Sequence, residues 1–193
     1  MRNLLVAAIV VFAVACTPAA QYAEMRSLTE DETRVEGVVT QVADNGYPRF
    51  SLALQPESGD PIGLYLNAES GADLGDQAPS SFEGQNVVAY YITVDDPQLV
   101  NVATASGAPV FPEDTIPPSA EDVTVTGVLS GADATTSSDL PDIISVTDTS
   151  GAAQQFEIFI TPELVAVNGQ TVSVMYRPGQ RYEITLMRVA TTE

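Results

Sequence analysis

Glu83-Gly-Gln-Asn-Val87 and Asn168-Gly-Gln-Thr-Val172 share the pattern Gly-Gln-x-Val. Each stretch leads into an apolar segment that contains a tyrosine, Tyr91 in the first case and Tyr176 in the second. A pattern that returns after about 85–90 residues is longer than a solenoid repeat and indicates a duplicated unit. The chain of 193 residues is therefore expected to hold two copies of one structural unit.

The segments around these two stretches repeat in the same order. Phe50, Leu52 and Leu54 alternate with small or polar residues, a period of two that is typical of a half-buried strand. Gly37 and Gly127 each interrupt the first apolar segment of their unit, where a small barrel needs a sharp bend. The expected strands are 35–42, 50–54, 62–66, 87–94 and 99–103 in the first unit, and 123–129, 143–146, 156–160, 172–176 and 182–189 in the second.

Five strands per unit favour closure into a small barrel, because an open sheet leaves unpaired edges. Between the third and fourth strands of the second unit, one helical turn is expected. Thr161 is suited to cap its N-terminus, and Pro162 is suited to its first helical position. This order resembles the OB-like domains of bacterial lipoproteins, including those grouped as tRNA-anticodon-like. The resemblance implies an all-β fold of two tandem five-stranded OB-like small barrels joined by a Pro-rich linker. Other small barrels and β-sandwiches fit the same short motifs.

Composition divides the chain into five parts. The expected boundaries are a signal peptide at 1–15, a polar tether at 16–33, a first OB-like domain at 34–105, a linker at 106–122 and a second OB-like domain at 123–190. The linker contains four prolines and almost no apolar periodicity, which is typical of a semi-rigid spacer.

The N-terminus has the features of an export signal. Arg2 precedes an apolar run at 4–15 that is too short to cross a bilayer of about 30 Å. Ala13, Val14 and Ala15 stand directly before Cys16, the one cysteine of the chain. This resembles the lipobox of bacterial lipoproteins, with Ala13 in place of the usual leucine. The resemblance implies cleavage before Cys16 and lipidation of that residue; an ordinary secretory signal is the alternative.

The lipobox reading predicts a location as well as an anchor. Thr17 follows Cys16, and in enteric-type sorting a lipoprotein without an aspartate there goes to the outer membrane. We therefore expect a lipid-anchored protein of the cell envelope, on the periplasmic face of the outer membrane. Its membrane contact is the lipid on Cys16.

Charge and missing residue types exclude several kinds of function. Beyond residue 15 the chain has six arginines and 26 acidic residues, a net charge of −20, which disfavours nucleic acid as a partner. Without histidine, lysine or a thiol other than Cys16 there is no Ser-His-Asp triad, Schiff base or thiol nucleophile. We expect no catalytic residues, no cofactor and no metal site, and we interpret the acids of loops 73–76 and 95–96 as solvated.

Four residues are candidates for binding a ligand. Arg177 and Arg181 flank a short loop before the last strand and are suited to grip a carboxylate or another anion; a hairpin kept soluble by charge is the alternative. Tyr65 and Tyr91 are candidates for a surface on which a ligand stacks; the alternative is that they pack in or around the core.

These observations predict a membrane-tethered, non-enzymatic binding or interaction lipoprotein of the cell envelope. Its partner would be another envelope protein or a small ligand. Two alternatives remain open: an OB module that binds nucleic acid or oligosaccharide, and a hydrolase that works with paired carboxylates.

Overall fold

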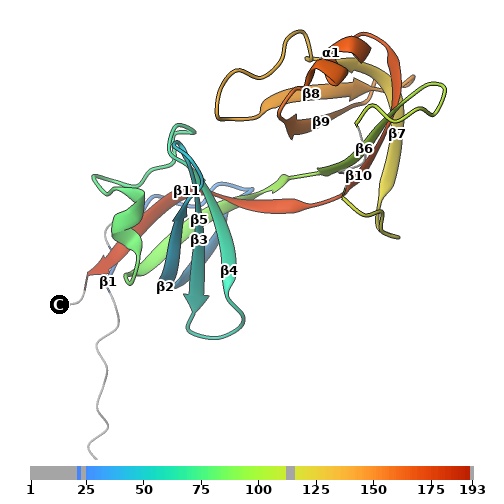
Figure 1. The fold of residues 1–193 in the computed structure, drawn as a ribbon. Helices are drawn as coiled ribbons and strands as arrows, with labels where there is room; N and C mark the ends of the chain where they lie inside the picture. Colours follow the sequence, from blue (N-terminus) through green and yellow to red (C-terminus); the bar gives the residue numbers. More distant parts are fainter. Residues whose placement is uncertain (1–20, 23–24, 112–115, 192–193) are drawn as a thin grey trace, which may run out of the picture.

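The computed structural model describes residues 21–22, 25–111 and 116–191, and it is an all-β fold of two small barrels (Figure 1). The first sheet contains β1 (Gln21–Tyr22), β2 (Thr33–Asp44), β3 (Arg49–Pro56), β4 (Ile62–Asn67), β5 (Asn86–Asp95) and β11 (Gln180–Thr191). The second sheet contains β6 (Gln98–Thr104), β7 (Val123–Ser130), β8 (Asp142–Thr147), β9 (Ala153–Ile158) and β10 (Thr171–Arg177). The expected signal peptide, at 1–15, and Cys16 lie outside the described residues.

The strand order confirms the predicted fold class. In the first barrel β11 pairs with β5 and, in parallel, with β4 through Glu183 and Tyr65, which closes the sheet. In the second barrel the order is β6-β10-β7-β8-β9. A short helix separates the third and fourth strands in each case, η1 (Pro79–Phe82) in the first barrel and α1 (Pro162–Val167) in the second. Five Greek-key strands with a helix at this point form an OB-like barrel.

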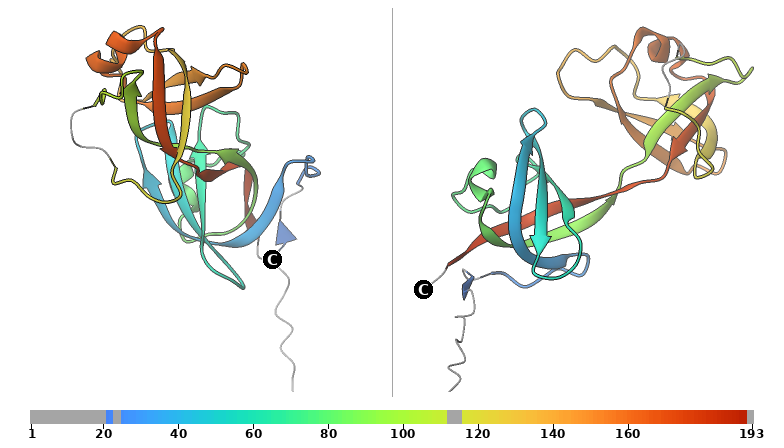
Figure 2. Two further views of the ribbon diagram at one scale, coloured as in Figure 1. Left: turned by 90° about the vertical axis from the view of Figure 1, so that its right-hand side faces the viewer. Right: turned by 60° about the horizontal axis from the view of Figure 1, so that its bottom comes forward.

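The main difference from the sequence-based assignment is that the two units exchange their closing strands. We expected 99–103 to close the first unit and 182–189 to close the second. Instead β6 pairs with β10 in the second barrel, and β11 pairs with β5 in the first. The backbone N–H of Asp96 donates to the carbonyl of Gly179 at 2.8 Å, so the two pairings run on into each other. We call this continuous two-stranded element, 86–104 with 171–191, the crossing ribbon (Figure 2).

Each barrel has its own apolar core, and corresponding residues of the two units fill it. Leu52 and Leu54 are buried in the first core, and Ile144 and Val146 are buried in the second, as their shared alternation predicts. The exchanged strands also contribute, because Ile184 of β11 belongs to the first core.

The predicted helix in the second unit is confirmed, with Thr161 at the N-cap and Pro162 in the first turn. The Thr161 side chain makes no capping hydrogen bond, so the start of α1 depends on its proline and on packing. Leu164 and Val167 face the second core from this helix.

The ends of the expected linker are part of the second barrel. The backbone N–H of Val110 donates to the carbonyl of Val102 at 2.8 Å, and the Val110 side chain is buried in the second core. The segment around Val110 therefore packs as part of the second barrel and is not a spacer between domains.

Residues 25–32, directly before β2, are packed on the first barrel. Met25 covers a small apolar cluster of Val88, Tyr90 and Leu186 on the outer face of β5 and β11. Residues that were expected to form a free tether therefore bury part of the crossing ribbon. Within the described residues, no helix is long and apolar enough to span a membrane.

Candidate functional site

An open groove of about 480 Å³ lies where the first barrel, the crossing ribbon and β9 of the second barrel meet. Its polar and aromatic lining is provided by Arg49, Tyr65, Asp96, Glu157, Arg181 and Tyr182. We call this feature the junction groove. The groove draws residues from both units, so it exists only when both barrels are assembled.

Strand alternation aims the first-barrel residues into the junction groove. Leu52 of β3 and Leu64 of β4 point inward to the core, so the odd-numbered residues of these strands point outward. Arg49 at the start of β3 and Tyr65 in the middle of β4 lie on this outer face. The strand exchange then places Arg181, the second residue of β11, beside them.

A network of ion pairs joins the two barrels across the groove. Nη1 of Arg49 donates to Oε2 of Glu157 at 2.9 Å, from the first barrel to β9 of the second. Nη1 and Nη2 of Arg181 both lie 3.4 Å from Oε1 of the same Glu157. Nη1 of Arg181 also donates to Oδ1 of Asp96 at 3.2 Å. One carboxylate of the second barrel is thus held between two guanidinium groups of the first.

Arg181 combines a stacked ring with an unused donor. Its guanidinium carbon lies 4.8 Å from the centroid of the Tyr65 ring, within the range of a cation–π contact. Its Nε is buried and has no hydrogen-bond partner, since the nearest carboxylate oxygen, from Glu183, is 3.7 Å away. Burial opposes the charge of Arg181, but Glu157, Asp96 and Glu183 outweigh it and raise the pKa of this guanidinium. Arg181 therefore stays charged.

Tyr65 is partly withdrawn from solvent beside these charges. Burial raises the pKa of the Tyr65 phenol above its usual value, although Arg49 and Arg181 act in the opposite direction. The groove thus offers a neutral aromatic face next to a cation at all ordinary pH values.

The structure brings together two of the four predicted ligand-binding residues. Arg181 and Tyr65 share the junction groove, and Tyr91 contacts Tyr182 of the groove wall with ring centroids 5.0 Å apart. Arg177 lies elsewhere: its Nε donates to Asp122 at 2.9 Å, and its Nη2 donates to the carbonyl of Pro117. The two arginines are separated because the crossing ribbon carries 171–177 into the second barrel and 180–191 into the first.

Sequence reasoning missed Arg49 and Glu157, and it interpreted Asp96 as a solvated loop acid, whereas Asp96 pairs with Arg181. Arg49 and Glu157 are 108 residues apart, and no local pattern links them. The scarcity of arginine is the one feature of the sequence that could have drawn attention to Arg49, which is one of only six arginines beyond the expected signal peptide.

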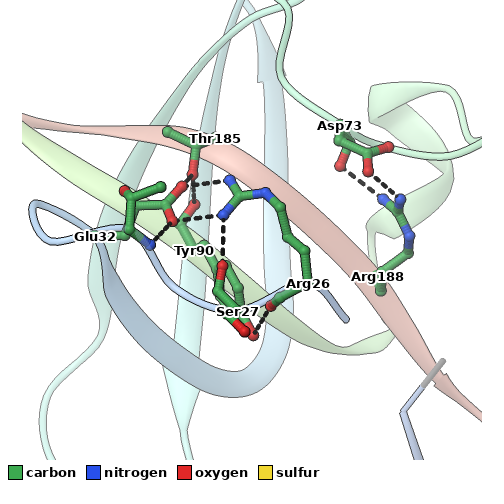
Figure 3. Close-up of polar contacts among 8 residues, drawn as sticks. Arg26, Ser27, Glu32, Asp73, Tyr90, Thr185 and Arg188 are labelled. Atoms are coloured by element: carbon green, nitrogen blue, oxygen red, sulfur yellow. Dashed lines mark hydrogen bonds and ion pairs between the residues drawn. The ribbon is translucent and has the colours of Figure 1, made fainter. Parts of the chain in front are cut away.

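A second polar cluster fixes the N-terminal segment to the crossing ribbon (Figure 3). The Glu32 side chain is only 2% exposed, and it accepts hydrogen bonds from Arg26, Thr185 and the backbone N–H of Thr29. The hydrogen bond from Arg26 is the main cause that holds the pKa of Glu32 well below its usual range, and it outweighs burial. The Tyr90 hydroxyl donates to the carbonyl of Arg26 at 3.1 Å. We interpret this cluster as structural, because its hydrogen bonds tie residues 26–32 to β5 and β11.

Other charged groups outside the groove are also paired. Arg188 of β11 donates to Asp73, and these hydrogen bonds are the main cause that lowers the pKa of that aspartate (Figure 3). In the ranges 21–22, 25–111 and 116–191, no three acidic, histidine or cysteine side chains gather in a way that would hold a metal ion. The junction groove remains the strongest candidate site in the described part of the chain.

No protein-family model and no curated protein matches this sequence. Among solved structures, the chain is similar to the cytoplasmic molybdate-binding protein ModG in a crystal form with molybdate bound. The two share 15% identity, the match covers 77% of this chain and 94% of that one, and the TM-score is 0.25. A likeness at this level carries no argument about a ligand. The OB-like assignment here rests on strand order, and the site rests on its own geometry.

Proposed function

We propose that this chain is a non-enzymatic binding module whose ligand site is the junction groove. The observation that carries the proposal is Arg181, whose guanidinium lies beside the Tyr65 ring in an open groove and whose buried Nε–H makes no hydrogen bond. A buried donor without a partner costs roughly 1–3 kcal/mol, which a ligand acceptor would recover. OB-like barrels commonly bind their ligands on the face that these strands form.

The groove is better suited to binding than to catalysis. Two carboxylates line it, Asp96 and Glu157, and both are engaged by arginine donors. The arrangement fixes charge and orientation, which is what a binding site requires.

The cell envelope is the proposed location, with lipid on Cys16 as the anchor. β1 pairs with the end of β11 through Gln21 and Thr191. Only residues 17–20 separate Cys16 from β1, a reach of at most about 17 Å. A lipid on Cys16 would therefore hold the first barrel close to the membrane and leave the second barrel free to meet another envelope protein.

Nuclear magnetic resonance of the intact domain pair tests the binding site. We expect at least one of five probes at millimolar concentration (succinate, sulfate, glycine betaine, spermidine or cellobiose) to shift the backbone amides of Gly63 and Gln180, which line the groove. Arg181→Gln should abolish the shift, because it removes the guanidinium donors. Arg34→Gln, which removes an equal charge outside the groove, should leave it unchanged.

Two results would contradict the proposed site. One is that no probe shifts these amides; the other is an equal shift in the Arg181→Gln protein. Circular dichroism melts of both variants check that the barrels remain folded.

Labelling with radioactive palmitate in a bacterial host tests the anchor. We expect the wild-type chain to take up label and to lose residues 1–15, as shown by the mass of its N-terminal peptide. Cys16→Ser should take up none, because it lacks the sulfur that carries the lipid, whereas the control Thr17→Ser should be labelled like the wild type. An unmodified thiol on the mature wild-type protein would rule the anchor out.

A further inference from the structure

Glu157 occupies the space between two arginines of the other barrel. Its Oε2 accepts from Arg49 at 2.9 Å, and its Oε1 faces both terminal nitrogens of Arg181 at 3.4 Å. Two guanidinium groups that converge on one carboxylate form a cradle whose shape and charge suit a carboxylate. The chain itself therefore shows which chemical group fits this end of the junction groove.

The cradle is only partly used by Glu157. Charge-assisted N–H···O bonds are usually about 2.7–2.9 Å long, so the contact with Arg49 is fully formed. Both contacts with Arg181, at 3.4 Å, are long, and the Nε of Arg181 makes no hydrogen bond, with the Glu183 carboxylate 3.7 Å away. A ligand carboxylate in the place of Glu157 could form two shorter, parallel hydrogen bonds with the terminal nitrogens of Arg181, where Glu157 forms two weak ones.

Glu157 is also able to leave. Its side chain is 31% exposed, and it belongs to β9, whereas both arginines belong to the first barrel and the crossing ribbon. Exposed ion pairs contribute little to stability, because solvent screens them. The two barrels stay joined through the crossing ribbon when this pair opens, so its loss does not unfold the protein.

We infer that the ligand of the junction groove is a small molecule that bears a carboxylate, and that this carboxylate takes the place of Glu157 on Arg181. This inference rests on the proposed function and adds the chemical class of the ligand. The inference also has a consequence for the contact between the barrels, since a bound ligand breaks the ion pair between Arg181 and Glu157. Binding would therefore loosen the second barrel on the crossing ribbon.

The charge of the whole protein agrees with recognition at short range. The mature chain carries a net charge of −20, so its long-range field repels anions. That field is screened beyond about 8–10 Å at physiological salt, whereas contacts at hydrogen-bond distance persist. Only a ligand group that reaches the two arginines directly gains from them, which favours a compact carboxylate over a polyanion.

Calorimetric titration with succinate tests the inference in the intact domain pair. We expect Glu157→Gln to bind succinate about fivefold more tightly than the wild type, because the competing carboxylate is gone. Arg181→Gln should show no binding. The matched control is Glu83→Gln, which removes the same charge from an exposed residue outside the groove and should bind like the wild type.

Three further results separate failure of this inference from failure of the proposed function. Binding of sulfate without binding of succinate overturns the carboxylate assignment but keeps the groove as a ligand site. Equal succinate affinity in the wild type and Glu157→Gln, with loss in Arg181→Gln, overturns displacement alone. If neither probe nor the other small molecules named above bind the groove, both proposals fail. The neutral analogue succinamide should not bind in any variant if the inference holds.

Discussion

Neither half of the chain is expected to fold when it is made alone, whereas an equimolar mixture of residues 21–111 and 116–193 should give both barrels. The reason is the crossing ribbon. A first half that ends at 111 keeps β6, which has no partner there, and lacks β11, which closes its barrel. The second half has the reverse defect, since it contains β11 and lacks β6.

The energetic loss for the first half is larger than its stability allows. Ile184 and Met187 of β11 are both almost completely buried in the first core. Removal of a large buried side chain costs about 2–5 kcal/mol, and two such losses approach the whole 5–15 kcal/mol of a typical domain. The missing strand also leaves the edges of β4 and β5 unpaired.

Circular dichroism of each half, before and after mixing, measures this expectation. Each half alone should show no cooperative melting transition, and the mixture should show one. The control is the full chain cleaved by a protease site placed at 112–115, which should melt like the uncut chain because the ribbon still joins the parts. A cooperative transition in residues 21–111 alone would contradict the exchanged topology.

The sequence predicted the elements well and their partners poorly. Alternation at Phe50, Leu52 and Leu54 reports which face of a strand is buried, and the structure confirms that Leu52 and Leu54 are in the core. The same kind of pattern in 99–103 and 182–189 indicates that each segment is a strand. It does not indicate which barrel each strand closes. Both units offer an equivalent position for a closing strand, because both are OB-like barrels with the same strand order. The connections at 96–97 and 178–179 are also long enough for a hairpin, so their length does not reveal the exchange.

The candidate site was predictable to the same extent. Arg181 and Tyr65 could be selected one by one, from the scarcity of arginine and from strand position. Their contact at 4.8 Å depends on β11 lying against the first barrel, which the exchange brings about. Arg177 looked equivalent to Arg181 in sequence, yet the ribbon takes it to Asp122 instead. The sequence thus identified residues suited to bind a ligand, but it did not identify the residues that they contact in the fold.

Gly127→Ala is expected to destabilise the second barrel by about 3 kcal/mol, near the upper end of the usual cost of overpacking. Gly127 lies in β7, and a Cβ atom there would stand 2.2 Å from the backbone carbonyl oxygen of Thr147. The obstacle is the backbone of a neighbouring strand, so no side-chain rotation relieves it. Gly37 in β2 repeats this geometry, with its Cβ position 2.3 Å from the carbonyl oxygen of Gln55. The close approach of two strands, at the position where the sequence suggested a bend, explains why both units have glycine there.

Thermal unfolding of single variants measures the effect, and the chain offers a matched control. Gly63 also lies in a strand, β4, but nothing stands within 4 Å of its Cβ position. Gly63→Ala should change the free energy of unfolding by no more than about 0.5 kcal/mol, as surface substitutions usually do. Gly127→Ala and Gly37→Ala should each lower the melting temperature by about 10 °C, at 2–4 °C per kcal/mol for a chain of this size. Because the two barrels share the crossing ribbon, each substitution should also weaken the other barrel, so one common transition is expected. A melting temperature for Gly127→Ala equal to that of Gly63→Ala would show that the strands do not approach each other in this way.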